Sequence, residues 1–350
     1  MRTRSARLLE VLMQAVEVGV APGAAAWIWQ DGSVEAEACA GVTRLAGGRE
    51  VTRDTLFDVA SLTKPVASCL ALRLVEAGRL AVGDPVAEQP VAGLADVLAH
   101  RAGFQAWLPL HRKVPADGWG TPAGKRIVIE AALGSTRTAP RQRTLYSDLG
   151  YISLVPLLEE RAGAGLEEAV RAHVTGPLGL ASTAFRPGGL GDVQKSWIAA
   201  TERVEHRGGT IQGVVHDDNA AAMGGVSTHA GLFSTARDMG VFAAACLESS
   251  RGRSSFLSRD LASWAMAPLR GGERTVIWDT KSPLGSTAGI AFGSRSVGHL
   301  GFTGCSIWID PDALIVSVLL TNRIHPSSTS EAIRTFRPAF HDAVITDILS

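Results

Sequence analysis

The sequence is poor in lysine and tyrosine, and it carries no net charge. Its 350 residues include 34 Lys and Arg residues, of which five are lysine, and two tyrosines. The 34 acidic residues balance the basic ones, so no basic field is present to attract nucleic acid or an anionic membrane surface. No apolar run reaches the roughly 18 residues of a spanning helix. We therefore expect a globular protein without nucleic-acid or membrane partners, in which the few lysines are placed for their chemistry.

Cysteine is also scarce and scattered. Cys39, Cys69, Cys246 and Cys305 contain no Cys-x-x-Cys pair. This arrangement is neither a zinc pattern nor a disulfide framework. It favours buried free thiols in a reducing compartment.

The N-terminus resembles a secretory signal only superficially. Leu8, Leu12, Val16 and Val20 recur at helical spacing, and Glu10 interrupts the apolar stretch. This pattern predicts an amphipathic first helix. We therefore expect a cytoplasmic location, and a periplasmic or secreted one is the alternative.

Strand-like segments lie near both ends of the chain, and helical patterns fill the middle. Residues 23–30 and 33–43 predict a hairpin around Asp31-Gly32. Residues 305–310 and 314–320 predict a second hairpin, and residues 330–348 a closing helix. The loop-rich middle indicates that a separate helical part is inserted between the two hairpins.

The expected fold is therefore an α/β (α+β) fold in two parts, since 350 residues exceed one compact core. Residues 1–58 and 276–350 would form an antiparallel sheet flanked by the N- and C-terminal helices. Residues 59–275 would form a mainly helical inserted domain, with the active site in the cleft between the parts. The Pro- and Gly-rich residues 109–124 predict a surface loop at the cleft mouth, and residues 278–279 are expected to shape the pocket.

Ser61-Leu62-Thr63-Lys64 is the first candidate for chemistry. If a helix starts near Ser61, the serine and the lysine lie on one face, and Lys64 could take the serine proton. Serine is a weak nucleophile without such a base. Pro65 fits the first turn of that helix. The alternative is an ordinary capped helix start with a solvated lysine.

The second candidate contains both tyrosines of the chain, in Tyr146-Ser147-Asp148-Leu149-Gly150-Tyr151. A phenol near a lysine can act as a general acid or base, and a neighbouring serine or carboxylate can orient it. The alternative is that Ser147 or Asp148 caps a helix while the tyrosine packs.

The third candidate is the glycine-rich run of residues 298–304, which precedes the strand of Cys305. Glycines allow the backbone to approach a ligand closely, and an edge strand here could offer an N–H group to an oxyanion. A glycine-rich turn with a surface histidine is the alternative.

Two histidines near the middle of the chain are weaker candidates. His216-Asp217-Asp218-Asn219 could bind a metal, but a polar loop at the cleft fits its spacing better. His229 is more consistent with a structural loop histidine than with a catalytic one.

Together the three stretches resemble the serine β-lactamase and penicillin-binding-protein superfamily, in particular the class C β-lactamase-related hydrolases, esterases and D-amino-acid peptidases. The order of Ser61-Leu62-Thr63-Lys64, Tyr146-Ser147-Asp148 and His299-Leu300-Gly301 agrees with that family. Val97-Leu98-Ala99-His100 and Gly231-Leu232-Phe233-Ser234-Thr235 resemble further parts of it. The similarity spans roughly residues 20–325.

The resemblance implies a role for each matching residue. Ser61 would be the acylated nucleophile, and Lys64 and Tyr146 would share the proton transfers. The backbone N–H groups of Ser61 and Phe302 would form the oxyanion hole. The remaining matched residues would bind the substrate; these are Asp148, His299, Leu300 and Gly301. The family needs no metal or cofactor.

Two departures from the family bear on the substrate. Asp148 stands where many β-lactamases have Asn, and a carboxylate cannot donate to a substrate carbonyl. His299-Leu300-Gly301 stands where others have Lys-Thr-Gly, so that motif lacks its permanent charge and its hydroxyl. We therefore expect an esterase or a peptidase or amidase, acting on a small ester, amide or peptide, rather than an efficient β-lactamase. A non-catalytic binding or sensor protein of the same fold is the alternative.

The mechanism expected for this site needs a base for Ser61. We hypothesise that its surroundings hold Lys64 largely neutral, so that it can work with Tyr146.

Overall fold

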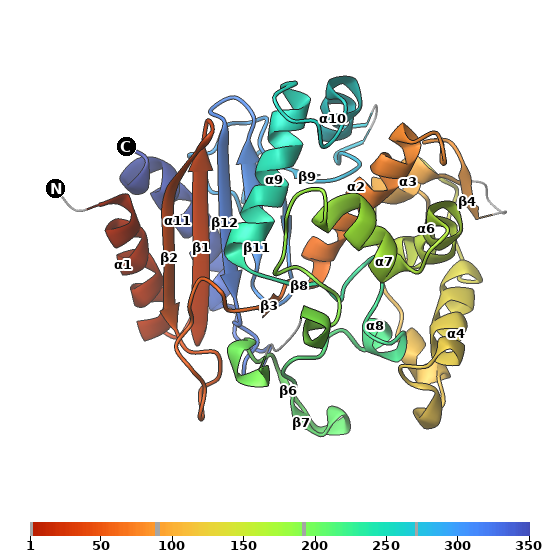
Figure 1. Cartoon of the computed structure of the whole chain (residues 1–350), viewed down its shortest axis with the longest axis horizontal. Coiled ribbons are helices and arrows are strands. Elements are labelled where there is room, and N and C mark those ends of the chain that lie inside the picture. Colours follow the sequence, from red (N-terminus) through yellow and green to blue (C-terminus); the bar gives the residue numbers. More distant parts are fainter. Residues whose placement is uncertain (1–2, 88–91, 191–193, 270–271) are drawn as a thin grey trace.

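A six-stranded antiparallel sheet, built from both ends of the chain, forms the middle layer of one half of the molecule, on the left in Figure 1. The computed structural model describes residues 3–87, 92–190, 194–269 and 272–350. The sheet order is β2-β1-β12-β11-β10-β9, so the N-terminal hairpin pairs directly with the C-terminal strands. The strands are β1 Gly23–Gln30, β2 Ser33–Gly41, β9 Asp279–Thr280, β10 Val297–Leu300, β11 Ser306–Asp310 and β12 Ile315–Thr321.

The two faces of the sheet are covered by different helices, as the alternation along β1 shows. Ala24, Ala26 and Ile28 belong to the apolar cluster of α1 (Arg4–Glu17) and α11 (Ala332–Ala343). Trp27 faces the other way, toward α9 (Ala236–Ser250). Successive side chains of a strand point to opposite faces, so a strand covered on both faces is apolar throughout. Figure 1 shows α1 and α11 on one side of the sheet and α9 on the other.

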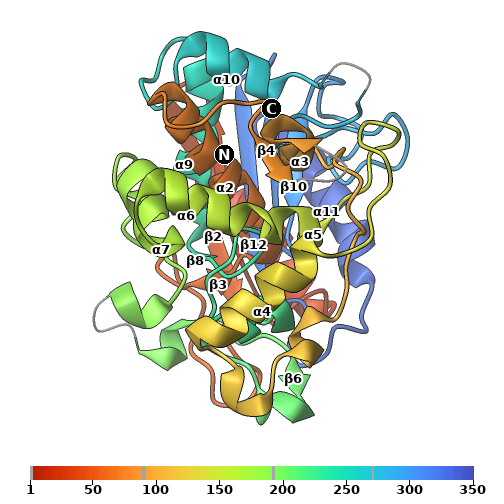
Figure 2. The same cartoon turned by 90° about the vertical axis from the view of Figure 1, so that its right-hand side faces the viewer.

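A layer of helices lies beside the sheet and faces the viewer in Figure 2. Its longest members are α2 and α4, and α5 continues almost directly into α6. The helices of this layer are α2 Thr63–Glu76, α3 Leu94–Leu98, α4 Pro122–Leu133, α5 Asp148–Ile152, α6 Leu154–Ala162, α7 Leu166–Val170 and α8 Asp218–Ala222. Helix α10 (Arg259–Met266) packs against α9 instead. The fold class expected from the sequence, an antiparallel sheet between terminal helices with helices inserted, is confirmed.

Short strand pairs connect the segments around this layer. Phe57 and Asp58 form β3, which pairs with β8 (Phe233–Ser234) immediately before the Ser61 turn. The other pairs are β4 Pro85–Ala87 with β5 Ala92–Gly93, and β6 Arg203–Val204 with β7 Gly209–Thr210. Among the described residues, no helix has the length and hydrophobicity to cross a membrane.

Several predicted elements agree closely with the observed ones. β1 has the predicted bounds, and positive φ angles at Asp31 and Gly32, 42° and 95°, match the turn type that an Asp-Gly hairpin favours. β11 and β12 lie at the predicted positions. Residues 330–348 contain α11 and then a single π-helical turn over Val344–Ile348.

Two expectations about the middle of the chain need correction. The predicted loop of residues 109–124 ends in helix α4, which starts at Pro122 because Thr121 caps it and proline suits a first helical turn. Helix α9 lies within the range 59–275 assigned to the inserted part, but it covers the sheet. A boundary at residue 275 would separate α9 from the surface that buries it.

Candidate active site

Ser61 lies in a tight, strained turn directly before α2. Ala60–Leu62 form a 3-10 turn, and α2 begins at Thr63. The observed α-helix therefore starts two residues after the predicted position at Ser61. Ala60 has a φ of 48°, which is rare for a residue other than glycine. Asp58 Oδ1 accepts a hydrogen bond from the Ala60 N–H at 2.9 Å, and Thr63 Oγ1 donates to the Ala60 carbonyl at 2.6 Å. These bonds hold the turn in its strained form.

Buried Asp58 ties this turn to the rest of the site. Its Oδ2 accepts from the backbone N–H of His216 at 2.8 Å, and its carbonyl accepts from Thr303 Oγ1 at 2.7 Å. The next residue, Val59, donates its N–H to the carbonyl of Leu232 at 3.0 Å. Burial raises the pKa of Asp58, and the two N–H donors oppose that rise. Three distant segments therefore fix the position of Ser61.

Lys64 is fully buried and reaches back to the serine. Its Nζ donates to Ser61 Oγ at 3.0 Å and to the carbonyl of His229 at 3.1 Å. The same Nζ lies 2.6 Å from Asp148 Oδ1. Burial alone would lower the pKa of Lys64, but the charges of Asp148 and then Tyr146 outweigh burial and raise it. The hypothesis of a neutral Lys64 is therefore wrong for the resting site, because the Asp148 carboxylate stabilises the ammonium.

The ring of Tyr146 lies over this lysine. Lys64 Nζ is 4.7 Å from the ring centroid, and the phenol interacts with the side chains of Lys64 and Ser61. Burial raises the pKa of Tyr146, and the charge of Lys64 opposes that rise. His100 packs on the ring at 4.5 Å between centroids and accepts from the N–H of Ser147 at 2.9 Å. Lys64 and Tyr146, which the sequence predicted to act together, are thus both brought into contact with Ser61.

His299 approaches Tyr146 from the sheet side. It lies on β10, with its ring centroid 5.9 Å from that of Tyr146. Its Nδ1 donates to the carbonyl of Leu300 at 3.0 Å, which leaves Nε2 as an acceptor. Burial, and then the charges of Lys64 and Arg274, hold the pKa of His299 well below its usual value. The histidine is therefore neutral at this position.

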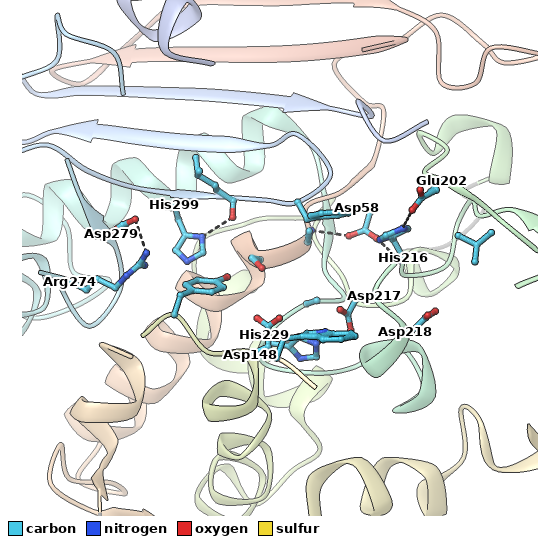
Figure 3. A pocket seen from close by; sticks show the side chains of 18 of the residues that line it. Asp58, Asp148, Glu202, His216, Asp217, Asp218, His229, Arg274, Asp279 and His299 are labelled. Carbon is cyan, nitrogen blue, oxygen red and sulfur yellow. Dashed lines mark hydrogen bonds and ion pairs between the residues drawn. The ribbon is translucent and has the colours of Figure 1, made fainter. Parts of the chain in front are cut away.

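Most of these residues border one cavity of about 720 Å³, shown in Figure 3, although buried Lys64 is not on its wall. The predicted residues on its wall are Ser61, Tyr146, Asp148, His299, Leu300 and Phe302. Gly301 is not on the wall. A Cβ at Gly301 would lie 2.6 Å from the carbonyl oxygen of Val59, so this glycine lets the end of β10 approach the nucleophile turn.

Arg274 is the main site residue that the sequence did not indicate. It lines the cavity, its Nη2 lies 2.8 Å from Asp279 Oδ2, and its Cζ lies 5.2 Å from the Tyr146 ring centroid. Of the two residues expected to shape the pocket, Asp279 lines the cavity and Trp278 is buried in the core. Although the motif at His299 lacks a permanent charge, Arg274 supplies one from a different segment.

The opposite end of the cavity is rich in carboxylates and histidines, which are largely paired with one another (Figure 3). His216 Nε2 lies 2.9 Å from Glu202 Oε2, and His229 Nε2 lies 2.9 Å from Asp217 Oδ1. Among the described residues, no group of three or more His, Cys, Asp or Glu side chains is arranged to hold a metal ion. His216 therefore lies in a polar loop at the cavity, and the carbonyl of His229 helps to hold Lys64.

A serine and a lysine in hydrogen-bond contact beneath a tyrosine, beside strand β10 of an antiparallel sheet, form an arrangement suited to a serine hydrolase that works through an acyl-enzyme. The chain belongs to the Beta-lactamase family, whose profile matches residues 10–338.

Curated relatives include hydrolases of amide bonds. An N-acetylmuramyl-L-alanine amidase of Bacillus subtilis is 28% identical, covering 92% of this chain and 82% of the relative. A putative D-alanyl-D-alanine carboxypeptidase of Salmonella gallinarum is 31% identical, covering 81% of this chain and 73% of the relative. The protein is therefore a serine hydrolase of ester or amide bonds.

Solved structures share the fold over nearly the whole chain. EstCE1, a hydrolase with promiscuous acyltransferase activity, matches with a TM-score of 0.76 at 21% identity, covering 97% of this chain and 98% of its own. The octameric penicillin-binding protein homologue from Pyrococcus abyssi matches with a TM-score of 0.72 at 18% identity, covering 98% of this chain and 77% of its own.

Proposed function

We propose that Ser61 is the nucleophile of an acyl-transfer reaction in which Lys64 and Tyr146 move the protons. The observation that carries this proposal is the 3.0 Å contact between Lys64 Nζ and Ser61 Oγ at the wall of the cavity. Ser61 Oγ attacks the substrate carbonyl and forms an acyl-enzyme as the leaving group departs. Water then attacks the acyl carbon and restores the serine.

Tyr146 is the better candidate for the base, because Asp148 keeps Lys64 protonated. In this scheme the Lys64–Tyr146 pair first loses one proton, and the ammonium of Lys64 stabilises the phenolate of Tyr146. The phenolate takes the Ser61 proton during attack and returns it to the leaving group. In deacylation it takes a proton from water and returns it to Ser61 Oγ.

The backbone N–H groups of Ser61 and Phe302 are the proposed oxyanion donors. Both residues line the cavity, and they approach it from the nucleophile turn and from the end of β10. Two preorganised N–H groups would stabilise the negative charge that develops on the carbonyl oxygen.

We propose that the substrate carries a free carboxylate close to the scissile bond, as in a peptide that ends in a D-amino acid. Arg274 is a permanent cation on the cavity wall, and its guanidinium has donors beyond the one that Asp279 occupies. Neutral His299 adds an acceptor on the same side, which suits an N–H group of the substrate and leaves Arg274 as the partner of the carboxylate. The carboxypeptidase and amidase activities named for the two curated relatives support an amide substrate.

A substrate panel tests this proposal with wild type, Arg274→Gln and Ser61→Ala. The panel contains nitrocefin, p-nitrophenyl butyrate, a peptide ending in D-alanyl-D-alanine, and the same peptide with an amidated C-terminus. Because a hydrogen bond to a charged group contributes about 1.5–3 kcal/mol, Arg274→Gln should lower kcat/KM for the free-acid peptide about 10–100-fold. The ester and the amidated peptide should change much less.

Three results would contradict parts of the proposal. An equal loss on the ester and on the acid peptide would refute carboxylate recognition by Arg274. A wild-type protein that turns over none of the four compounds would refute the catalytic assignment and favour a binding or sensor protein. A Ser61→Ala variant as active as wild type would refute Ser61 as the nucleophile.

A further inference from the structure

The turn that follows β10 has most of its carbonyl groups bound by two arginines. Arg337 Nη2 donates to the carbonyls of Gly301 at 2.7 Å and Cys305 at 2.9 Å, and its Nε donates to that of Gly304 at 3.3 Å. Arg323 binds the carbonyl of Phe302 through Nε at 3.1 Å and Nη2 at 2.8 Å. Four of the carbonyl groups of residues 301–305 thus accept hydrogen bonds from these two arginines.

This arrangement decides where the N–H groups of the turn point. In a trans peptide the carbonyl of one residue and the N–H of the next point in opposite directions. The Gly301 carbonyl points to Arg337, so the Phe302 N–H points away from Arg337. Phe302 lies on the cavity wall with Ser61. The bond from Arg337 therefore orients the same peptide group that offers the proposed oxyanion donor.

Arg337 is an unusual residue for this position. It comes from α11, is only 8% exposed, and forms no ion pair with a carboxylate of the described residues. A buried cation without a counter-ion is costly to retain, and here its partners are the carbonyls of one turn. Burial lowers the pKa of Arg337 to about 10, which still leaves it charged at neutral pH.

We propose that Arg337 is a positioning residue for the oxyanion hole, and that Arg323 assists it. Arg337 fixes the 301–302 peptide so that its N–H faces the carbonyl oxygen of the substrate. Its positive charge also polarises that peptide, which strengthens the N–H as a donor. The inference rests on the proposed function, because it needs an oxyanion to form above Ser61.

A purely structural role of Arg337 would have different measurable consequences. In that case Arg337 would only attach α11 to the turn, and its removal would lower stability without changing the binding of the transition state relative to the substrate. The two roles are separated by comparing the affinity for a transition-state analogue with KM. Phenylboronic acid suits this purpose because its serine adduct is tetrahedral and places an oxygen where the oxyanion forms.

The test uses Arg337→Met and Arg337→Lys in the full chain, with p-nitrophenyl butyrate as substrate. Loss of one oxyanion donor lowers kcat about 10²–10³-fold, so partial misalignment in Arg337→Met should lower kcat about 10–100-fold while KM changes little. The inhibition constant of phenylboronic acid should rise by a similar factor. Arg337→Lys, which keeps the charge, should recover part of the loss.

Arg334→Met is the matched control, because Arg334 lies on the same helix but is exposed and pairs with Glu331. It should leave kcat and boronate affinity at wild-type values. If Arg337→Met does not fold, Arg323→Met is used instead and should have a smaller effect in the same direction. Arg323 holds the carbonyl of Phe302, which belongs to the next peptide, and so fixes Phe302 from its other side.

The inference is overturned if a folded Arg337→Met or Arg323→Met keeps both kcat and boronate affinity while only its unfolding temperature falls. A rise in KM alone would overturn it as well. Turnover that persists in Ser61→Ala would have a different meaning, because it would refute the proposed function itself.

Discussion

Asp148 controls the protonation state of the residues around Ser61. Its carboxylate lies 2.6 Å from Lys64 Nζ and is 18% exposed. Its charge raises the pKa of Lys64 and adds to the rise caused by burial in the pKa of Tyr146. At neutral pH both groups are therefore protonated at rest. The proposed mechanism needs one of these protons to leave, so we expect kcat/KM to rise toward alkaline pH.

Asp148→Asn tests this expectation. Removal of the negative charge makes it easier for Lys64 and Tyr146 to lose a proton, so the midpoint of the alkaline rise should move to lower pH. Opposite charges at such short range shift a pKa by about 1–3 units, and we expect a shift of about one unit or more. The pH profile of kcat/KM on an uncharged ester measures it.

Asp54→Asn serves as the control for Asp148→Asn, since this carboxylate is 71% exposed. It should leave the midpoint unchanged. A midpoint that stays fixed or moves to higher pH in Asp148→Asn would show that another group governs the profile.

For single residues, the sequence indicated the candidate site where a reactive residue type occurs at a spacing that brings it close to its partner. Ser61 and Lys64 are three residues apart, and Tyr146 is one of two tyrosines, so residue type and position could be recognised directly. Arg274 carried no such signal. Its place beside Tyr146 results from the path of the chain into β9, and nothing in its neighbours along the sequence records that contact.

At the scale of elements, the contact between α9 and β1 connects the middle of the chain to the sheet. A Cβ added at Gly240 would lie 2.0 Å from a ring atom of Trp27. This glycine therefore lets the helix approach the strand closely. For that reason we infer that the part of the molecule built around the sheet includes α9, and that the inserted helical part ends before it.

Gly240→Ala should destabilise the protein even though alanine is the better helix former. Alanine favours a helix by up to about 1 kcal/mol over glycine. Overpacking of a core typically costs about 1–3 kcal/mol, and the contact with Trp27 leaves no room for a small adjustment. We expect a lower free energy of unfolding in urea.

Gly83→Ala is a suitable comparison, because an added Cβ would have no neighbour within 4 Å. Its unfolding midpoint should stay close to that of wild type. A midpoint for Gly240→Ala equal to or above wild type would show that α9 does not rest on Trp27 as described.

Elements with a clear period or a strong turn signal were predictable from sequence. The N-terminal hairpin and the strands β11 and β12 lie where alternation, apolar runs and Asp-Gly placed them. Helix α4 was not predicted, because the glycines and prolines before it dominate the local pattern. Which face α9 covers could not be predicted, since that depends on its partner strand.

For the whole molecule, the site exists only because distant segments meet. Ser61 comes from the turn before α2, Tyr146 from the approach to α5, His299 from β10, and Arg274 from the segment before β9. Arg337 supports the same place from α11 near the C-terminus. The order of the motifs indicated the family, whereas the charge balance of the cavity became visible only in three dimensions.

The central claim is that Ser61 becomes acylated, and intact-mass measurement tests it most directly. Wild-type protein and Ser61→Ala are incubated with a fluorophosphonate probe, weighed, and digested to map the adduct. Wild type should gain the mass of a single adduct, located on the peptide that contains Ser61, and Ser61→Ala should gain none. An adduct on another residue, or labelling that persists in Ser61→Ala, would contradict the account.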